Sequence, residues 1–323
     1  MNEFALIERF FRRAPRDAAV RLGIGDDAAI VAPTPGCEIA LSVDMLVEGR
    51  HFLAGTDPER LGHKALAVNL SDMAAMGATP RFALLAGALP ASDDAWLDAF
   101  MRGFRALAER HGTELVGGDT TRGPRNLCVT IVGEVPAGAA ITRGGARPGD
   151  DVYVSGSLGD AALALAALDG RTKLDRDALD AARERLERPL PRVELGVRLR
   201  GVATAAIDVS DGLVGDLGHV VERSGAGAAL DVGALPTSSA LAAKLDGNER
   251  ALALQCALAG GDDYELCFCA PPDARATIAR LASALVLPLT RIGAITAERA
   301  LVVRDENGAP LRALPRAYDH FAP

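Results

Sequence analysis

The chain has 323 residues, of which 49% are hydrophobic and 4% aromatic, and its formal net charge at pH 7 is −8. This acidic balance argues against a nucleic-acid-binding protein, and no apolar stretch approaches the 18 residues of a membrane span, so we expect neither a nucleic-acid nor a membrane partner. At about 150 residues per domain, the length predicts two domains, each with enough chain to bury a core.

The five cysteines are odd in number, and only Cys267 and Cys269 are close in sequence. No second Cys or His pair accompanies them, so they do not indicate a zinc site. We therefore expect reduced core thiols in a cytoplasmic protein.

In the N-terminal half, apolar periodicity predicts strands and helices that interleave without a strict βαβ repeat. Ser92 is expected to cap a long helix. One strand is expected to end at Asp44, just after its last apolar residue. The expected helices are 3–11, 61–76 and 96–111, and the expected strands are 22–31 in part, 38–43, 82–89 and 127–135.

A loop-rich stretch over 136–151 separates this half from a second one of similar character. The second half is expected to hold strands 152–155, 203–209, 228–232 and 265–270, with helices 160–168, 171–188, 213–223, 252–259 and 273–285. The sequence thus predicts an α/β fold with mixed sheets. It predicts an N-terminal domain over 1–137, an inter-domain loop over 138–150 and a C-terminal domain over 151–323.

Six acidic motifs stand beside Gly, Ser or Thr, where a predicted strand or helix ends. They are Gly25-Asp26-Asp27, Ser42-Val43-Asp44, Asn69-Leu70-Ser71-Asp72, Gly118-Asp119-Thr120-Thr121, Asp208-Val209-Ser210-Asp211-Gly212 and Gly261-Asp262-Asp263-Tyr264-Glu265. If several of these carboxylates converge, their repulsion requires cations. Oxygen ligands without a His or Cys cluster favour Mg²⁺, which commonly serves phosphoryl transfer together with substrate phosphates.

Each motif also has a plain structural interpretation. Asp72 could be a solvated helix residue with Asn69 as its partner, and Ser210 and Asp211 could be ordinary helix caps. If Asp72 is instead a metal ligand, we expect Asn69 to support it. Arg143 lies on the predicted inter-domain loop, where it could reach a phosphate or remain a solvated surface residue.

Neither a P-loop motif nor the protein-kinase motif set is present. His51 follows a predicted loop and could contact a substrate or simply be exposed.

Eight motifs occur in order along nearly the whole chain: Ile24–Ala29, Ser42-Val43-Asp44, His51-Phe52, Lys64–Gly77, Gly117–Gly123, Asp208–Leu213, Gly261–Leu266 and Tyr318-Asp319-His320-Phe321. This set resembles the thiamine-monophosphate kinase family. That family belongs to a superfamily of ATP-binding enzymes that includes aminoimidazole ribonucleotide synthetase and selenophosphate synthetase.

The resemblance implies a two-domain α/β kinase, a homodimer formed through its N-terminal domains. It implies transfer of the γ-phosphoryl group of ATP to thiamine monophosphate, giving thiamine diphosphate, with several Mg²⁺ ions. By similarity, the metal positions are Asp27, Ser42, Val43, Asp44, Asp72, Asp119, Asp208 and Asp211. The nucleotide positions are Gly118, Asp119, Arg143 and Ser210, and the substrate positions are His51, Asp262 and Tyr318. Catalysis is then assigned to Asp72, Asp119, Arg143 and Asp211.

Two positions depart from the family pattern. Val43 stands where relatives often carry a hydroxyl, so a metal contact there would use the backbone, and Asp262 stands where Glu is common. Whether Asp26 or Asp27 ligates metal stays open. The alternative functions are another ATP-dependent enzyme of the superfamily, resembling aminoimidazole ribonucleotide synthetase, or a non-catalytic protein that binds Mg²⁺ and nucleotide.

Overall fold

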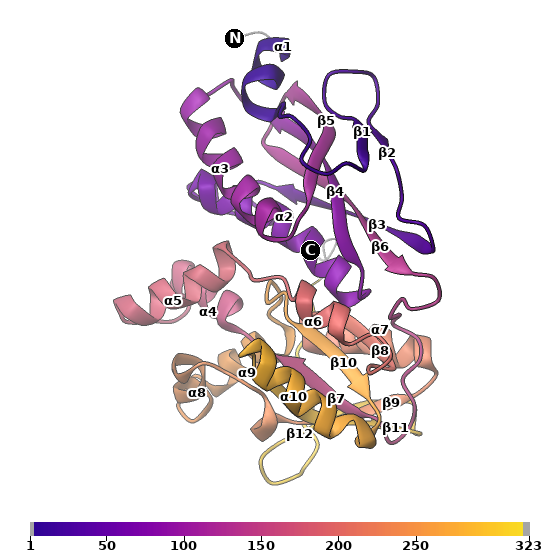
Figure 1. Ribbon diagram of the computed structural model, residues 1–323. Helices are drawn as coiled ribbons and strands as arrows, with labels where there is room; N and C mark the ends of the chain where they lie inside the picture. The colour runs from indigo at the N-terminus through magenta and orange to yellow at the C-terminus, as the bar shows by residue number, and fades with distance from the viewer. Residues whose placement is uncertain (1–2, 319–323) are drawn as a thin grey trace. The chain divides into compact units, whose positions relative to one another are not determined.

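The computed structural model describes residues 3–318 (Figure 1), without the side chains of residues 3 and 4. The chain separates into two compact units. The N-terminal unit comprises residues 1–73 and 78–140, and the C-terminal unit comprises 74–77 and 141–323. Both units contain a β-sheet and helices, which confirms the predicted α/β fold. Within the described residues, no helix is long and apolar enough to cross a lipid bilayer.

The N-terminal unit is built on a four-stranded sheet. Its strands lie in the order β3 (Cys37–Val47), β6 (Asn126–Pro136), β4 (Thr79–Leu89) and β5 (Glu114–Arg122). Only β4 and β5 run parallel. The other elements of the unit are α1 (Glu3–Leu6), η1 (Ile7–Phe11), the small β1 (Val20–Leu22) and β2 (Ile30–Val31) pair, α2 (Pro58–Ala75) and α3 (Asp94–Arg110).

Helices α2 and α3 pack closely because each carries a glycine at their contact. A Cβ at Gly62 would lie 1.9 Å from the Phe100 carbonyl oxygen, and one at Gly103 would lie 1.8 Å from that of Glu59. Helix α2 also packs on the sheet, where Met73 lies against Gly133 on β6. The helix is thereby fixed against both neighbours, so its polar residues have defined positions.

Strand β3 places its apolar residues on the side of the sheet that α2 does not cover. Ile39, Leu41, Val43 and Met45 alternate along it and are 46% to 67% exposed. Ser42 and Asp44 point the opposite way, toward α2, because neighbouring strand residues face opposite sides of a sheet. We call the side defined by Ile39, Leu41, Val43 and Met45 the open sheet face.

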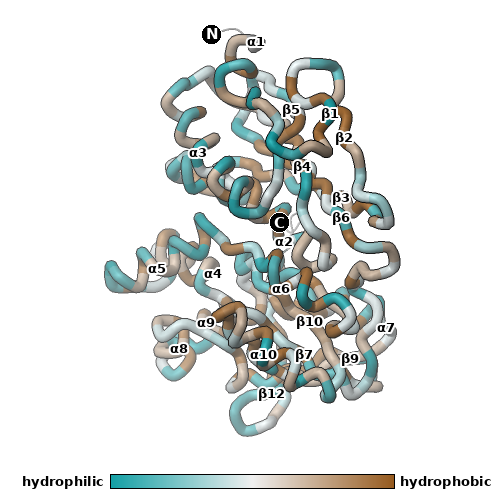
Figure 2. The backbone as a smooth tube through the Cα atoms, viewed as in Figure 1, coloured by the Kyte–Doolittle hydropathy of each residue, from teal (hydrophilic) through white to brown (hydrophobic). Residues whose placement is uncertain are grey.

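The C-terminal unit is built on a six-stranded sheet that is antiparallel except for one strand pair. Its order is β12 (Leu301–Arg304), β9 (Gly227–Asp231), β11 (Leu289–Thr296), β7 (Asp151–Ser155), β10 (Leu266–Ala270) and β8 (Ala205–Asp208). The helices are α4 (Asp160–Leu168), α5 (Arg176–Glu187), α6 (Val193–Arg198), α7 (Leu213–Ser224), α8 (Ser239–Leu245), α9 (Arg250–Ala259) and α10 (Arg275–Leu285), with short turns η2 (Val232–Ala234) and η3 (Pro272–Ala274). Figure 2 shows that hydrophilic residues run along much of α5. Strands β7, β8 and β10 are buried along their whole lengths.

Several predicted boundaries were wrong. Strand β3 continues to Val47, because every residue up to there pairs with β6, so Asp44 lies inside the strand. Asp119 likewise lies inside β5 and does not follow the end of a strand, whereas Asp72 lies inside α2, as in the predicted helix 61–76. The cap of α3 is Asp93, whose carboxylate accepts the Trp96 N–H, and not Ser92. The sequence analysis also missed α6, α8, β11 and β12.

Candidate active site

In the N-terminal unit, strand β3 and helix α2 bring two of the predicted metal positions together. Ser42 donates a 2.5 Å hydrogen bond from its hydroxyl to the Asp72 carboxylate. Asp72 is only partly buried, so the pair lies at the edge of the packed helix. Val43 lies between Ser42 and Asp44, but its side chain is on the open sheet face, which leaves only its backbone to face a ligand at Ser42.

Asn69 connects α2 to β3 from a fully buried position. Its Oδ1 accepts the backbone N–H of Asp44 at 3.2 Å, and its Nδ2 donates to the Ala65 carbonyl oxygen at 3.1 Å. The amide therefore fixes the backbone of Asp44 through these bonds, whereas the sequence suggested support for Asp72. A buried amide with both ends bonded is a rigid spacer between helix and strand.

Asp119 lies on the other side of the same sheet. The residue row Met45, Cys128, Ala86 and Asp119 crosses the sheet from β3 to β5, so Asp119 shares the open sheet face with Met45. Three strand spacings separate Asp119 from the β3 position, which is about 14 Å. Within one chain, the side chains of Asp44 and Asp119 therefore point to opposite faces.

Gly118, beside Asp119, occupies a position that only glycine can fill. Its φ is +152°, and a Cβ there would lie 1.9 Å from the Leu85 carbonyl oxygen. This close approach to β4 fixes the backbone that leads into Asp119.

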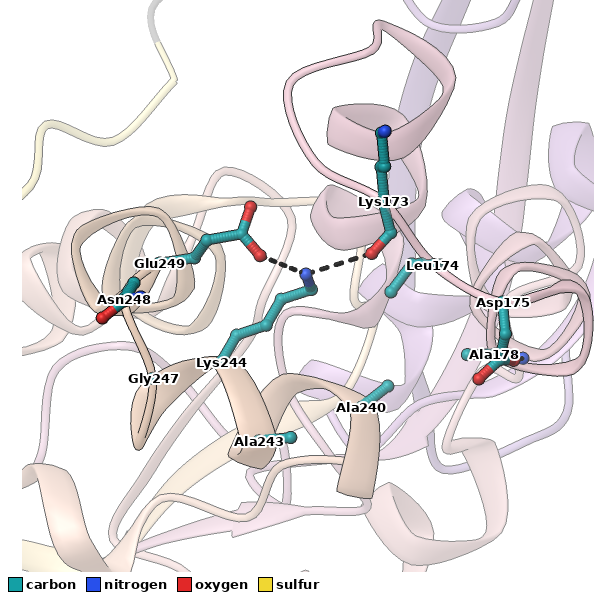
Figure 3. A pocket seen from close by; sticks show the side chains of 10 residues that line it. All are labelled: Lys173, Leu174, Asp175, Ala178, Ala240, Ala243, Lys244, Gly247, Asn248 and Glu249. Atoms are coloured by element: carbon teal, nitrogen blue, oxygen red, sulfur yellow. Dashed lines mark hydrogen bonds and ion pairs between the residues drawn. The ribbon is translucent and has the colours of Figure 1, made fainter.

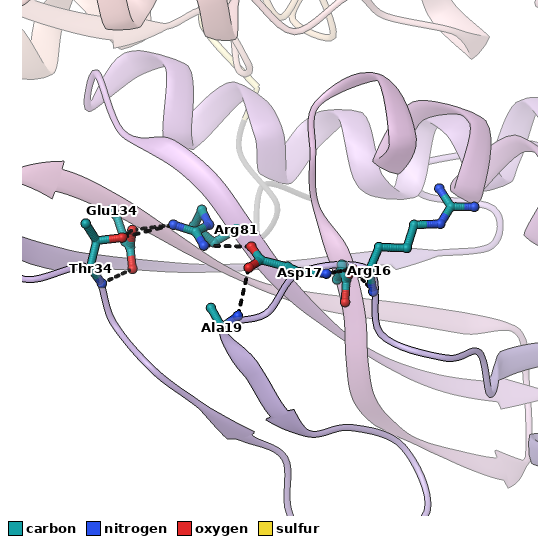
Figure 4. A network of polar contacts seen from close by, with 7 residues as sticks. Arg16, Asp17, Ala19, Thr34, Arg81 and Glu134 are labelled. Atoms are coloured by element: carbon teal, nitrogen blue, oxygen red, sulfur yellow. Dashed lines mark hydrogen bonds and ion pairs between the residues drawn. The ribbon is translucent and has the colours of Figure 1, made fainter.

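Asp27 lies in an exposed turn between β1 and β2, next to Asp26, which accepts its backbone N–H at 2.9 Å. The segment that carries this turn runs from Asp17 to Thr34, and Arg81 anchors its start (Figure 4). Arg81 bonds to Asp17 at 2.6 Å and to Glu134 at 2.7 Å. Thr34, at the other end of this segment, donates its backbone N–H and its hydroxyl to Glu134. One arginine and one buried carboxylate thus fix both ends of the segment that carries the acidic turn.

His51 follows β3 in a turn of the N-terminal unit. The ring Nδ1 of His51 accepts the Val47 backbone N–H at 3.0 Å, and the backbone N–H of His51 donates to the Val47 carbonyl oxygen at 3.0 Å. The ring is half-buried and has a defined orientation, so the loop around it is ordered at this point.

In the C-terminal unit, a tight loop over Ser210, Asp211 and Gly212 follows β8 and its terminal residue Asp208. Asp216, from the first turn of α7, accepts the backbone N–H of all three loop residues at 3.0 to 3.1 Å, through the single oxygen Oδ2. Burial, with the nearby charges of Asp208 and Asp211, raises the pKa of Asp216 to about 7. No side chain of Ser210 or Asp211 caps α7, so the helix-cap interpretation was wrong.

Two more predicted site residues meet this loop through their backbones. The N–H of Asp262 donates to the Ser210 carbonyl at 2.8 Å, and that of Tyr318 donates to the Asp211 carbonyl at 3.2 Å. Asp262 has a φ of +61° and Tyr264 one of +49°, left-handed values that non-glycine residues rarely adopt. Ser210, Asp211, Asp262 and Tyr318 are thus collected in one place. Residues 319–321 of the terminal motif lie outside the described residues.

The sequence analysis missed Asp216 and the role of Glu265. Glu265 is fully buried and accepts bonds from Ser155 at 2.6 Å, from Arg192 at 2.5 and 2.6 Å and from Arg185 at 2.5 Å. A signal for Asp216 existed, because it falls at the helical spacing of the apolar residues Leu213, Leu217 and Val220, where a charge is unexpected. No comparable signal marks Arg185 or Arg192.

Residues 25–135 match the family "AIR synthase related protein, N-terminal domain", and residues 147–306 match "AIR synthase related protein, C-terminal domain". The thiamine-monophosphate kinase of Salmonella typhimurium is 46% identical over 326 residues, which cover 99% of this chain and 98% of that relative. The chain belongs to the thiamine-monophosphate kinase family.

Two solved structures extend this similarity. A crystal structure of the thiamine-monophosphate kinase from Stenotrophomonas maltophilia has a TM-score of 0.87 and 47% identity, covering 96% of this chain and 98% of that one. The structure of AaThiL complexed with AMPPCP and TMP has a TM-score of 0.78 and 31% identity, covering 90% and 89%. The resemblance drawn from the sequence motifs is therefore confirmed for the family and the fold.

The acidic residues that were predicted as metal ligands all offer oxygen donors. Within the described part of the chain, no three Asp, Glu, His or Cys side chains gather as a metal-binding group. Arg143 is exposed, with its carbonyl near the Ser224 hydroxyl at 3.4 Å. All five cysteines are free thiols, but only Cys256, Cys267 and Cys269 are buried, so the prediction of core thiols was wrong for Cys37 and Cys128, which are partly exposed.

One cavity of this thiamine-monophosphate kinase family member contains none of the predicted site residues (Figure 3). It has a volume of about 570 Å³ and lies in the C-terminal unit, beside α8 and the start of α5. Lys244, on its wall, already bonds to Glu249 at 2.5 Å and to the Thr172 hydroxyl at 2.6 Å. The Lys244 ammonium is thus neutralised within the chain, and we assign the cavity no role.

Proposed function

We propose that this protein transfers the γ-phosphoryl group of ATP to the phosphate of thiamine monophosphate, producing thiamine diphosphate and ADP. The observation that carries the proposal is the near full-length identity of 46% to a thiamine-monophosphate kinase. The ordered loop that joins Ser210, Asp211, Asp262 and Tyr318 supports it. So does the similarity to a structure complexed with AMPPCP and TMP.

The residues predicted to hold Mg²⁺ suit that ion in their chemistry. They are Asp27, Ser42, the Val43 backbone, Asp44, Asp72, Asp119, Asp208 and Asp211. Mg²⁺ usually takes one or two protein carboxylates and completes its shell with water and substrate phosphates, so small groups such as Ser42 with Asp72 fit it better than a cage of carboxylates would. Bound Mg²⁺ would neutralise and align the phosphates.

The remaining roles concern the two substrates. We assign nucleotide contacts to Gly118, Asp119, Arg143 and Ser210, and thiamine monophosphate contacts to His51, Asp262 and Tyr318. Asp262 is shorter than the usual Glu. Its backbone is nevertheless anchored to Ser210, which brings the residue to the nucleotide loop.

In the reaction, an oxygen of the thiamine monophosphate phosphate forms a bond to the γ-phosphorus as the bond to the bridging oxygen of ADP breaks. The attacking oxygen is already ionised, so no strong general base is needed. The barrier is mainly the repulsion between two polyanions, and catalysis rests on positioning and charge neutralisation. Arg143 would bind the transferred phosphoryl group, and Asp72, Asp119 and Asp211 would hold the cations that flank it.

We further propose that the protein is a homodimer formed through the open sheet face. A contiguous exposed apolar row such as Ile39, Leu41, Val43 and Met45 is typical of an interaction surface. A second copy on the open sheet face would lie against the face that also carries Asp119. The free thiols of this protein support a cytoplasmic location.

The direct test is incubation of the purified protein with ATP, Mg²⁺ and thiamine monophosphate, followed by chromatographic detection of thiamine diphosphate. We expect one thiamine diphosphate for each ADP formed. ATP binding measured by calorimetry without any phosphorylated thiamine product would overturn the proposed function and favour a nucleotide-binding protein without catalysis.

A further inference from the structure

The last part of the described chain forms a strap across the C-terminal unit, and we call residues 311–318 the terminal strap. Its start is fixed, because the backbone N–H of Leu311 donates to a carbonyl oxygen of β12 at 2.8 Å. Leu311 and Leu314 pack against the core of the unit. Farther along, the Arg316 carbonyl oxygen accepts a bond from the Gln255 side chain of α9 at 3.4 Å. The strap therefore follows a defined path.

The terminal strap ends at the loop that follows β8. Tyr318 donates its backbone N–H to the Asp211 carbonyl oxygen at 3.2 Å, and Asp262 donates to the carbonyl oxygen of the preceding residue, Ser210, at 2.8 Å. The two residues that are predicted to contact thiamine monophosphate in this unit are thus bonded to consecutive carbonyl groups. Tyr318 is 46% exposed, so its place beside Asp262 depends on where the strap lies.

Helix α7 contacts the terminal strap through a glycine. Gly215 lies in the first turn of α7, and a Cβ at this position would lie 2.6 Å from the Ala317 Cβ. Carbon atoms pack at about 3.5–4.0 Å, so an alanine at position 215 would separate the two segments by about 1 Å. Glycine within a helix lowers stability relative to alanine, and the close approach of the strap gives a reason for it here.

The terminal strap, and not the helix, would move to make room for such an alanine. Leu213, Leu217 and Val220 fix α7 in the core, where each is at most 1% exposed. The residues on either side of Ala317 are exposed, so few contacts oppose a shift of the strap. A methyl group at position 215 would therefore change the position of the strap next to Tyr318.

Gly218 on the same helix provides a comparison. It lies about one turn beyond Gly215, and a Cβ there would meet no atom within 4 Å. Alanine at either position adds one methyl group to the same helix. Only the alanine at position 215 would touch the terminal strap, so the two glycines separate an effect on the strap from an effect on the helix.

We infer that Gly215 is a positioning residue for thiamine monophosphate, because it lets the terminal strap lie directly on α7 and so sets the place of Tyr318 beside Asp262. The inference rests on the proposed function in taking thiamine monophosphate as the substrate and Tyr318 as one of its contacts. A strap displaced from α7 would carry Tyr318 away from Asp262. The loop after β8 would stay where Asp216 holds it.

Gly215→Ala tests the inference, and Gly218→Ala is the matched control. We expect Gly215→Ala to weaken thiamine monophosphate binding about tenfold, which is the effect of about one hydrogen bond. Gly218→Ala should bind thiamine monophosphate as the wild type does. Ala317→Gly removes the methyl group on the other side of the contact, so the double variant Gly215→Ala/Ala317→Gly should recover most of the lost affinity.

Calorimetry measures the binding of thiamine monophosphate in the presence of Mg²⁺ and the ATP analogue AMPPCP, and separately the binding of AMPPCP alone. AMPPCP affinity should be the same in all variants, because the loop that carries Ser210 does not move. Thermal melting should show every variant folded. Unchanged thiamine monophosphate affinity in Gly215→Ala, or an equal loss of AMPPCP affinity, overturns the inference.

Tyr318→Ala tests whether Gly215 acts through this tyrosine. In a chain that already carries Tyr318→Ala, Gly215→Ala should weaken thiamine monophosphate binding no further, because the contact it displaces is gone. Losses that add in the double variant overturn the inference. Since binding is measured without turnover, a wild-type protein that binds thiamine monophosphate but makes no thiamine diphosphate would overturn the proposed function alone.

Discussion

The carboxylate oxygen Oδ2 of Asp216 accepts the backbone N–H of Asp211 at 3.1 Å, and the same oxygen accepts the N–H groups of Ser210 and Gly212. A single buried atom thus sets the shape of the loop that carries a predicted metal ligand and a predicted nucleotide contact. We expect Asp216→Ala to reduce kcat/KM by about 100-fold, because small misplacements at a reacting centre have effects of this size.

Asp216→Asn is the matched variant, because its amide oxygen can accept the same three bonds. We expect it to retain most of the activity, and circular dichroism should show both variants folded. Steady-state kinetics at several Mg²⁺ concentrations distinguish the role of the Asp216 charge from its role in shaping the loop. Equal losses of kcat/KM in Asp216→Ala and Asp216→Asn would mean that the charge, and not the loop geometry, matters.

Asp72 and Asp211 are the next pair to test. Asp72→Asn and Asp211→Asn should each lower turnover by at least about 100-fold, because a neutral amide is a much weaker Mg²⁺ ligand than a carboxylate. Neither change alters side-chain volume much, so thermal melting should remain near that of the wild type. If both variants turn over at close to the wild-type rate with saturating Mg²⁺, the multi-metal proposal fails.

The sequence predicted the fold class and the order of most elements, because apolar periodicity reports burial directly. It misplaced the end of β3 because a charge at Asp44 was taken to mark a strand end. The alternation of Leu41, Val43 and Met45 in fact continues past it, and pairing with β6 stabilises the longer strand. Which sheet face each residue occupies depends on that pairing, so the separation of Asp44 from Asp119 could not be inferred.

The candidate site in the C-terminal unit shows a second limit of sequence reasoning. Asp262 reaches Ser210 only because its backbone is left-handed, and no pattern in a single sequence specifies that conformation. Asp216 could have been found from the sequence, because it is a lone charge on the apolar face of α7. A buried carboxylate on such a face needs donors, and the nearest orphan N–H groups are those at the start of the helix.

Arg81 provides a test of how the acidic turn of the N-terminal unit is supported. Arg81→Ala should lower the free energy of unfolding by about 3 kcal/mol, because it leaves the buried Glu134 carboxylate without its cation and releases Asp17. Arg102→Ala is the control, since Arg102 pairs with Glu59 on the surface and should contribute less than about 1 kcal/mol. Urea unfolding measures both, and equal small effects would show that Arg81 does not anchor the segment.

His111, at the end of α3, predicts a pH dependence of stability. Burial, with the nearby Arg110 and His63, lowers the pKa of His111 from 6.5 to about 4. Between these values the unfolded chain binds more protons than the folded one, so the stabilisation is complete above pH 6.5 and is lost as the pH falls toward 4. With its partial exposure allowed for, the effect should be about 2 kcal/mol.

His111→Gln should flatten that part of the stability profile, whereas His219→Gln, which changes an exposed histidine, should leave it unchanged. Denaturant unfolding across the acidic range gives both profiles. An identical slope in His111→Gln and the wild type would assign the acid sensitivity to other groups.

The open sheet face allows dimerisation and activity to be tested together. Leu41 is 67% exposed in the single chain, and Leu41→Glu would place a charge at the centre of the proposed interface, where an unpaired buried charge opposes association. We expect sedimentation equilibrium to show a monomer, and we expect kcat/KM to fall at least about 100-fold, because the open sheet face also carries Asp119. Val286→Glu is the control, because Val286 is 91% exposed on the other unit and should change neither property. A wild-type protein that is monomeric and fully active would contradict the dimer, whereas a monomeric Leu41→Glu with normal turnover would retain the dimer but place the whole site within one chain.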